Sequence, residues 1–174
     1  SEFIIPSTAG LYIDTNGGTV ALANANSDDN DVYLNGKLTV NGDVNIGTSS
    51  NNNQDIEYSG GGDSEIDIQG GIFFVNGQVR RNPATTAGVL KYNQSGGDLT
   101  INGSNSLTSN AKLEILNAGS EFNMSGGTMT IVRGGGDGTY GDLYLRPESS
   151  TVTGGEIIFN PGGAGDQDYL LAAA

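Results

Sequence analysis

A pair of adjacent glycines recurs along the chain at nearly constant intervals, and a short alternating segment follows each pair. The pairs are Gly17-Gly18, Gly70-Gly71, Gly96-Gly97, Gly126-Gly127 and Gly154-Gly155. The last four are separated by 26, 30 and 28 residues, and the phrases that follow them are I-F-F-V, D-L-T-I, T-M-T-I and E-I-I-F. An interval of this length is typical of repeat architectures, in which one supersecondary unit stacks on the next.

Each interval contains two more segments in which apolar and polar residues alternate, so one repeat carries three strand candidates. Every second side chain of a strand lies on the same face, and alternation therefore assigns inward and outward sides. The residues expected to face inward are Leu99, Ile101, Leu113, Ile115, Phe122, Met124, Met129, Ile131, Leu143, Leu145, Val152, Ile157 and Phe159. Their outward neighbours include Thr100, Glu114, Asn123, Thr130 and Tyr144. Turn-forming residues bound these segments, as is typical of short strands.

This pattern predicts an all-β chain folded as a single-stranded parallel β-helix, or β-solenoid, with about three short strands in each coil of roughly 26–30 residues. Each coil pairs with the coils above and below, and its apolar side is buried only when neighbours stack on it. We expect a right-handed coil, because parallel connections are almost always right-handed. A β-sandwich would also contain many short strands, but it does not require one phrase at a fixed interval.

The repeat indicates one solenoid domain over residues 4–171. Residues 66–160 form its regular coils, whereas residues 4–65 carry the same alternation with less regular spacing. Residues 1–3 and 172–174 read as cloning scars and are left out of the domain. Longer polar insertions, which we expect to project as loops, lie at residues 27–31, 48–55, 80–87 and 133–141.

The charge balance and the missing residue types exclude several classes of function. Seven basic residues stand against twenty acidic residues, which gives a formal net charge of -13. Nucleic-acid binding requires clustered lysine and arginine, so neither a nucleic-acid partner nor an anionic membrane surface is expected. No apolar run has the roughly 18 residues of a membrane helix, and membrane insertion is not expected. The chain has no cysteine and no histidine, which excludes Cys-His and Ser-His-Asp nucleophiles and the commonest zinc sites.

The repeated phrases resemble those of a known group of proteins. Residues 118–131 read A-G-S-E-F-N-M-S-G-G-T-M-T-I, and the variants K-Y-N-Q-S-G-G-D-L-T-I and S-S-T-V-T-G-G-E-I-I-F occupy residues 91–101 and 149–159. This string resembles the repeats of large secreted, adhesin-like surface proteins of Bacteroidetes-type bacteria. The resemblance implies parallel β-helix repeats and an extracellular or cell-surface location. It concerns architecture, and it supplies no catalytic residues.

An acidic cluster lies in the phrase S-D-D-N-D-V-Y, in which Asp28, Asp29 and Asp31 precede an alternating segment. Three interpretations are open: a solvated loop, a calcium site, and a catalytic carboxylate group of the kind that polysaccharide-cleaving β-helices use. Calcium binds six to eight oxygen ligands, more than one coil supplies unless its neighbours contribute. We favour the solvated loop and keep calcium as the candidate ion; no other cofactor is expected.

Arg80-Arg81 is the one basic doublet in the sequence, and Asn82-Pro83 follows it. We expect an ordinary loop here, from which the two guanidinium groups are able to contact a carboxylated glycan. Tyr140 and Tyr144 are placed at loop or outward positions, where an aromatic ring is able to stack on a sugar. These four residues are therefore the candidate ligand contacts.

The function expected from these observations is a noncatalytic structural or adhesive segment of a large secreted bacterial surface protein. Its partners would be surface polysaccharides, contacted through loops, or neighbouring repeats of the parent protein. The alternative is a polysaccharide-active β-helix enzyme of the lyase or hydrolase type, or an accessory region of such an enzyme. Binding of glycans without turnover would distinguish the first hypothesis from the second.

Overall fold

The computed structural model describes residues 2–23, 31–47, 54–59, 64–102, 110–132, 142–160 and 169–171, which contain strands and no helix. In this part of the chain no helix has the length and apolar character that crossing a membrane requires. The strands are β1 (Phe3–Ile5), β2 (Gly10–Ile13), β3 (Thr19–Leu22), β4 (Val32–Leu34), β5 (Lys37–Asn41), β6 (Asp43–Ile46), β7 (Ile56–Tyr58), β8 (Ser64–Gly70), β9 (Ile72–Val75), β10 (Val79–Arg81), β11 (Leu90–Gln94), β12 (Asp98–Ile101), β13 (Leu113–Val132), β14 (Leu143–Asn160) and β15 (Tyr169–Leu171).

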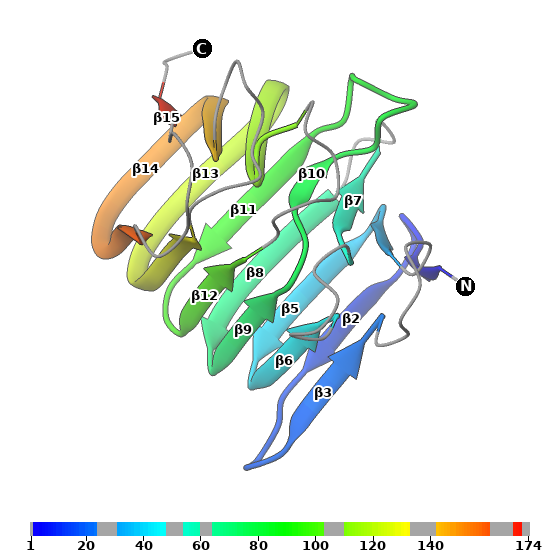
Figure 1. Cartoon of the computed structure of the whole chain (residues 1–174), viewed down its shortest axis with the longest axis vertical. Helices are drawn as coiled ribbons and strands as arrows, with labels where there is room; N and C mark the ends of the chain where they lie inside the picture. Colours follow the sequence, from blue (N-terminus) through cyan, green and yellow to red (C-terminus); the bar gives the residue numbers. More distant parts are fainter. Residues whose placement is uncertain are drawn as a thin grey trace.

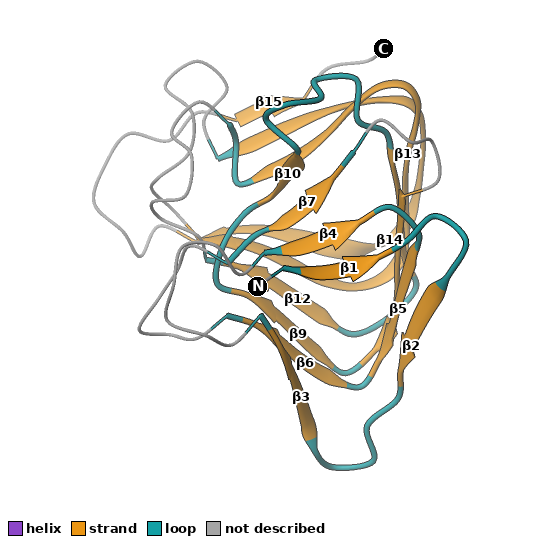
Figure 2. Cartoon of the chain, turned by 90° about the vertical axis from the view of Figure 1, so that its right-hand side faces the viewer, coloured by secondary structure: helices purple, strands orange, loops and turns teal. Residues whose placement is uncertain are grey.

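Each strand pairs in parallel with the strand at the same position of the next coil, and three faces result. Face 1 consists of β1, β4, β7, β10, the starts of β13 and β14, and β15. Face 2 consists of β2, β5, β8, β11 and the middle segments of β13 and β14, and its strands lie side by side in Figure 1. Face 3 consists of β3, β6, β9, β12 and the ends of β13 and β14. The predicted all-β solenoid with three strands in each coil is confirmed, and Figure 2 shows the faces around their common core.

The strands β13 and β14 are long because each continues around the corners of its coil. Their pairing shifts register between Asn117 and Glu121, and again between Met124 and Thr128. The three straight parts of β13 coincide with the three alternating segments of the sequence repeat. A repeat of the sequence therefore corresponds to one coil of the structure.

The predicted inward positions form the core over most of the chain. Ten of the thirteen are buried, from Leu99 to Leu145 in sequence order. Inward side chains also stack from coil to coil, as the rings of Tyr92 and Phe122 do at a centroid distance of 5.3 Å.

The last three inward positions, all in the C-terminal part of β14, pair in register with the buried Met124, Met129 and Ile131, but they are not buried themselves. Val152 is 60% exposed and Phe159 is 36% exposed, while Ile157 is partly buried against the core. Within the described residues, β15 alone pairs with the far side of β14, and it reaches only residues 143–145. An inward position is buried only when coils stack on both sides of it.

Candidate functional site

A polar tripeptide recurs where the chain enters face 1. Its first residue is polar, its second is aliphatic and inward, and its third is charged or a tyrosine. The five copies are Asp31-Val32-Tyr33, Asp55-Ile56-Glu57, Gln78-Val79-Arg80, Lys112-Leu113-Glu114 and Asp142-Leu143-Tyr144. The first and third residues of these tripeptides lie on the outer side of face 1, and we call them the face-1 polar ladder.

The ladder is buried although it lies on the outer side of the coil. Of its ten residues only Tyr33 is partly exposed, and Gln78 and Lys112 have no exposed surface. Alternation correctly predicted the outward direction of Glu114 and Tyr144, but it did not predict that they are 1% and 7% exposed. Buried polar and charged groups are tolerated only when they have partners. The hydrogen bonds and ion pairs within the ladder therefore show whether its side chains bind one another or are available for a ligand.

One end of the ladder is a cluster of three acidic residues, two of which bind Arg80. Asp31, Asp55 and Glu57 bring carboxylate oxygens within 4.8 Å of one another. Arg80 Nη2 lies 2.7 Å from Asp55 Oδ2 and 2.5 Å from Glu57 Oε1. Its Nε also donates to Asp55 Oδ2 at 2.9 Å. The guanidinium thus lies where a cation shared by Asp55 and Glu57 would be held.

Backbone and amide donors satisfy further carboxylate oxygens of this cluster. The backbone N–H of Asp55 donates to Asp31 Oδ1 at 2.8 Å, and that of Gln78 donates to Asp55 Oδ1 at 2.6 Å. Asn82 Nδ2 donates to Glu57 Oε2 at 2.8 Å. Each of these bonds joins one coil to the next. The bonds accepted by Asp55 and Glu57 are charge-assisted hydrogen bonds, which are stronger than neutral ones. They connect successive coils.

Asp31 differs from the other two acids because it forms no ion pair with an arginine of the described residues. Burial is the main reason that the pKa of Asp31 is raised to about 7, and the charges of Asp55 and Glu57 act in the same direction. The backbone hydrogen bond from Asp55 and the charge of Arg80 oppose this rise. Asp31 is therefore a carboxylic acid that holds its proton close to neutral pH.

Asp31→Asn is expected to make stability less dependent on pH between about 4 and 7. Over this window the unfolded chain ionises Asp31, whereas the folded chain keeps it protonated, so wild-type stability falls as the pH rises and levels off above about 7. Asparagine keeps the acceptor for the Asp55 N–H and does not titrate. Urea unfolding at pH 4 and pH 8 should show the variant gaining stability over the wild type at the higher pH. A difference that is the same at both pH values would contradict the assignment.

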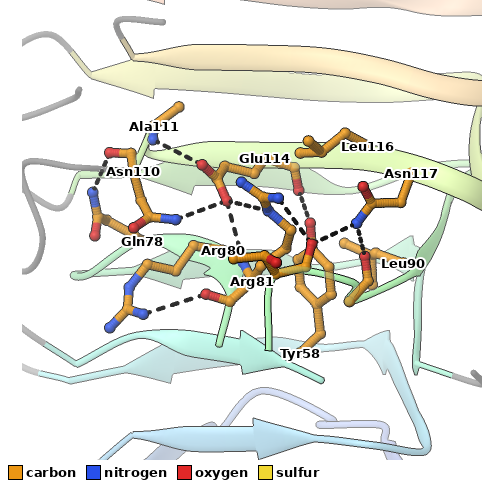
Figure 3. A network of polar contacts seen from close by, with 12 residues as sticks. Tyr58, Gln78, Arg80, Arg81, Leu90, Asn110, Ala111, Glu114, Leu116 and Asn117 are labelled. Carbon is orange, nitrogen blue, oxygen red and sulfur yellow. Dashed lines mark hydrogen bonds and ion pairs between the residues drawn. The ribbon is translucent and has the colours of Figure 1, made fainter. Parts of the chain in front are cut away.

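A second network surrounds Glu114 in the middle of the ladder (Figure 3). Arg81 Nε lies 3.1 Å from Glu114 Oε2, and Asn110 Nδ2 donates to the same oxygen at 3.0 Å. The backbone N–H of Ala111 donates to Oε1 at 3.3 Å. The hydroxyl of Tyr58, which lies in the core, donates to the Glu114 backbone oxygen at 2.6 Å. Side chains from three successive coils therefore meet at one residue, Glu114: Arg81 and Asn110 at its carboxylate, and Tyr58 at its backbone oxygen.

The third part of the ladder is a buried lysine. Lys112 Nζ donates to the backbone oxygen of Val132. Burial lowers the pKa of Lys112 to about 8, although the nearby charge of Asp142 opposes the change. The ammonium group of Lys112 therefore binds the backbone of its own coil and does not extend into solvent.

A pocket of about 330 Å³ opens where the ladder ends, at the corner of β13 and β14. It is lined by Leu116, Asn117, Ala118, Tyr144, Arg146 and Glu148. Leu116 pairs with Arg146 in the parallel ladder, and Tyr144 and Arg146 lie on the same side of β14 because they are two residues apart. Tyr144, one of the predicted ligand contacts, thus forms part of the wall of a pocket.

The structure differs from the sequence prediction at the arginine doublet. Arg80 and Arg81 belong to β10 and not to a loop, and both side chains are held by carboxylates of neighbouring coils. The loop prediction failed because Val79 occupies an inward position, which places this segment in the coil. A ligand-contact role for the two arginines stays a prediction, and their guanidinium groups already have partners inside the protein.

The predicted acidic site is only partly covered by the structure. Asp28, Asp29 and Tyr140 lie outside the described residues, so a calcium site formed by Asp28, Asp29 and Asp31 stays a prediction. The structure instead joins Asp31 to Asp55 and Glu57, two residues that the sequence analysis missed. The signal that could have found them is the tripeptide that recurs at the start of five face-1 segments, in β4, β7, β10, β13 and β14.

No protein-family model, curated protein or solved structure matches this chain.

Proposed function

We propose that the chain is a noncatalytic β-helical segment of a large secreted bacterial surface protein, where it serves as a rigid stalk or adhesive module. Its role is to present the outer surfaces of its coils to glycans at the cell surface or to neighbouring repeats of the parent protein. The resemblance of its repeated phrases to adhesin-like surface proteins agrees with this role.

The observation that carries the proposal is that the buried carboxylates bind partners inside the protein. Asp55, Glu57 and Glu114 are each no more than 3% exposed, and their oxygens bond to arginines and to groups of neighbouring coils. A catalytic carboxylate must reach the bond that it cleaves. These carboxylates instead bind groups of neighbouring coils, as expected of a scaffold that holds its coils in register.

A polysaccharide-cleaving enzyme is the second candidate, and one observation favours it. Asp31 has a raised pKa and lies beside two further carboxylates, which is the environment of a general acid in glycoside hydrolysis. Against this role, Arg80 occupies the space between Asp55 and Glu57, where a substrate oxygen would have to enter.

The test is a glycan array followed by a product assay on every polymer that binds. The wild-type chain is expected to bind at least one class of surface polysaccharide, because polar side chains stack in rows on its outer faces, as Asn93 does beside Asn123 and Thr100 beside Thr130. No release of reducing ends or unsaturated sugars is expected. An array without a single bound glycan would overturn the adhesive part of the proposal.

A further inference from the structure

The exposed residue Arg146 is unusual among the basic side chains of this protein. Within the described residues Lys37, Arg80, Arg81 and Lys91 all form ion pairs with carboxylates. The fifth, Lys112, donates to a backbone oxygen. Arg146 forms no ion pair with any described residue, although the chain has twenty acidic residues and a net charge of -13.

This arginine is exposed and lines the pocket at the corner of β13 and β14. Leu116, Ala118 and Tyr144 supply apolar lining, and Glu148 also lines the pocket. Tyr144 and Leu116 are buried against each other in a small apolar cluster with Ala111. The pocket therefore combines an apolar wall with one positive group, and both are held on paired strands instead of a loop.

The remaining polar groups of the pocket are fixed by the fold. Asn117 Nδ2 donates to the backbone oxygens of Thr86 and Gly88, and Glu148 accepts the N–H of Gly119. These bonds hold the rim in place before any ligand arrives, which lowers the entropic cost of binding. Arg146 is thus the group that remains available for a charged ligand.

We propose that this pocket binds a carboxylated sugar unit of an acidic polysaccharide. Arg146 accommodates the carboxylate, because its planar guanidinium matches the two carboxylate oxygens. Tyr144, Leu116 and Ala118 contact the apolar face of the sugar ring. A volume of about 330 Å³ is at the lower end of small-molecule sites, so the pocket suits a short segment of the polymer. This assignment rests on the proposed glycan-binding function and specifies its ligand class.

The test is calorimetric titration with three probes: a trimer of galacturonic acid, the methyl ester of the same trimer, and a trimer of galactose. The wild type is expected to bind the acid at least 10-fold more tightly than the ester or the neutral trimer. Arg146→Gln should abolish this preference, whereas Arg146→Lys should keep a part of it. The acid contact should also weaken as the salt concentration rises.

Lys91→Gln is the matched control. It removes one exposed positive charge from the Lys91–Glu121 pair on face 2, neither residue of which lines the pocket, and it should change the affinity for the acid by less than twofold. Equal losses in Arg146→Gln and Lys91→Gln, or equal binding of acid and ester, would overturn the proposal. Circular dichroism melting of each variant excludes unfolding as the cause.

The experiments distinguish an error in the pocket assignment from an error in the proposed glycan-binding function. If other glycans bind in the array while no carboxylated glycan does, the pocket assignment is wrong and the adhesive function stands. If no glycan of any class binds, both are wrong.

Discussion

Replacing Gly127 with alanine is expected to destabilise the protein by about 3 kcal/mol or more. This residue has a φ of 77°, a conformation that side chains with a Cβ atom rarely adopt. A Cβ atom would also lie 2.3 Å from the backbone oxygen of Gly97 in the coil below. Strain and collision therefore act together at this corner, and urea unfolding of the variant should measure their sum.

Three other glycines separate the two causes. Gly126 lacks a positive φ, but its added Cβ would meet the Ser95 backbone oxygen at 2.4 Å, so Gly126→Ala tests collision alone. Gly17 has a φ of 84° with no described atom within 4 Å of the added Cβ, so Gly17→Ala tests strain alone at about 1 kcal/mol. Gly18 has neither feature, and Gly18→Ala should change stability by less than about 0.5 kcal/mol. A loss in Gly126→Ala no larger than in Gly18→Ala would contradict the stacking explanation.

Arg80→Met should cost about 3–5 kcal/mol, because it leaves two buried carboxylates without their counter-charge. Arg80 is 4% exposed and contacts both Asp55 and Glu57. Methionine fills much of the same space without the guanidinium, so the loss measures the charge interaction more than the packing. Thermal and urea unfolding at pH 8 would give the value.

Two further variants test whether the loss of stability in Arg80→Met comes from its buried ion pairs. Lys91→Met breaks an exposed ion pair of 3.9 Å with Glu121, and its cost should stay below about 1 kcal/mol. The triple variant Asp55→Asn, Glu57→Gln, Arg80→Met removes the buried charges together, and it should be more stable than Arg80→Met alone. A single Arg80→Met loss as small as that of Lys91→Met would show that the cluster does not hold the coils together.

The solenoid could be predicted from sequence because its strongest signal is local and repeated. Alternation fixed the inward side of Leu113 and Phe122, and the glycine pairs marked the corners, where the second glycine of a pair such as Gly126-Gly127 has a positive φ. The same rule placed Val152 and Phe159 on the inward side, and both are exposed. The rule gives the direction of a side chain, but burial also requires a neighbouring coil on each side.

The buried charge ladder could not be predicted in the same way. Alternation placed Glu114 and Tyr144 outward, and an outward residue of a strand is ordinarily solvated. The tripeptides that begin face 1 recur at intervals of 24, 23, 34 and 30 residues between Asp31 and Asp142. This spacing is less regular than that of the glycine pairs because the intervening insertions differ in length. An alignment on the glycines therefore did not bring Asp55, Glu57 and Arg80 into one register.

The central claim is that the buried carboxylates hold the coils and do not cleave a substrate. The most direct measurement is the release of reducing ends and unsaturated sugars from each polysaccharide that the wild-type chain binds, assayed at pH 5 and pH 8 beside the Asp31→Asn variant. We expect binding by both proteins and no release by either. Release by the wild type that Asp31→Asn abolishes while binding is retained would contradict the claim and identify Asp31 as a catalytic acid.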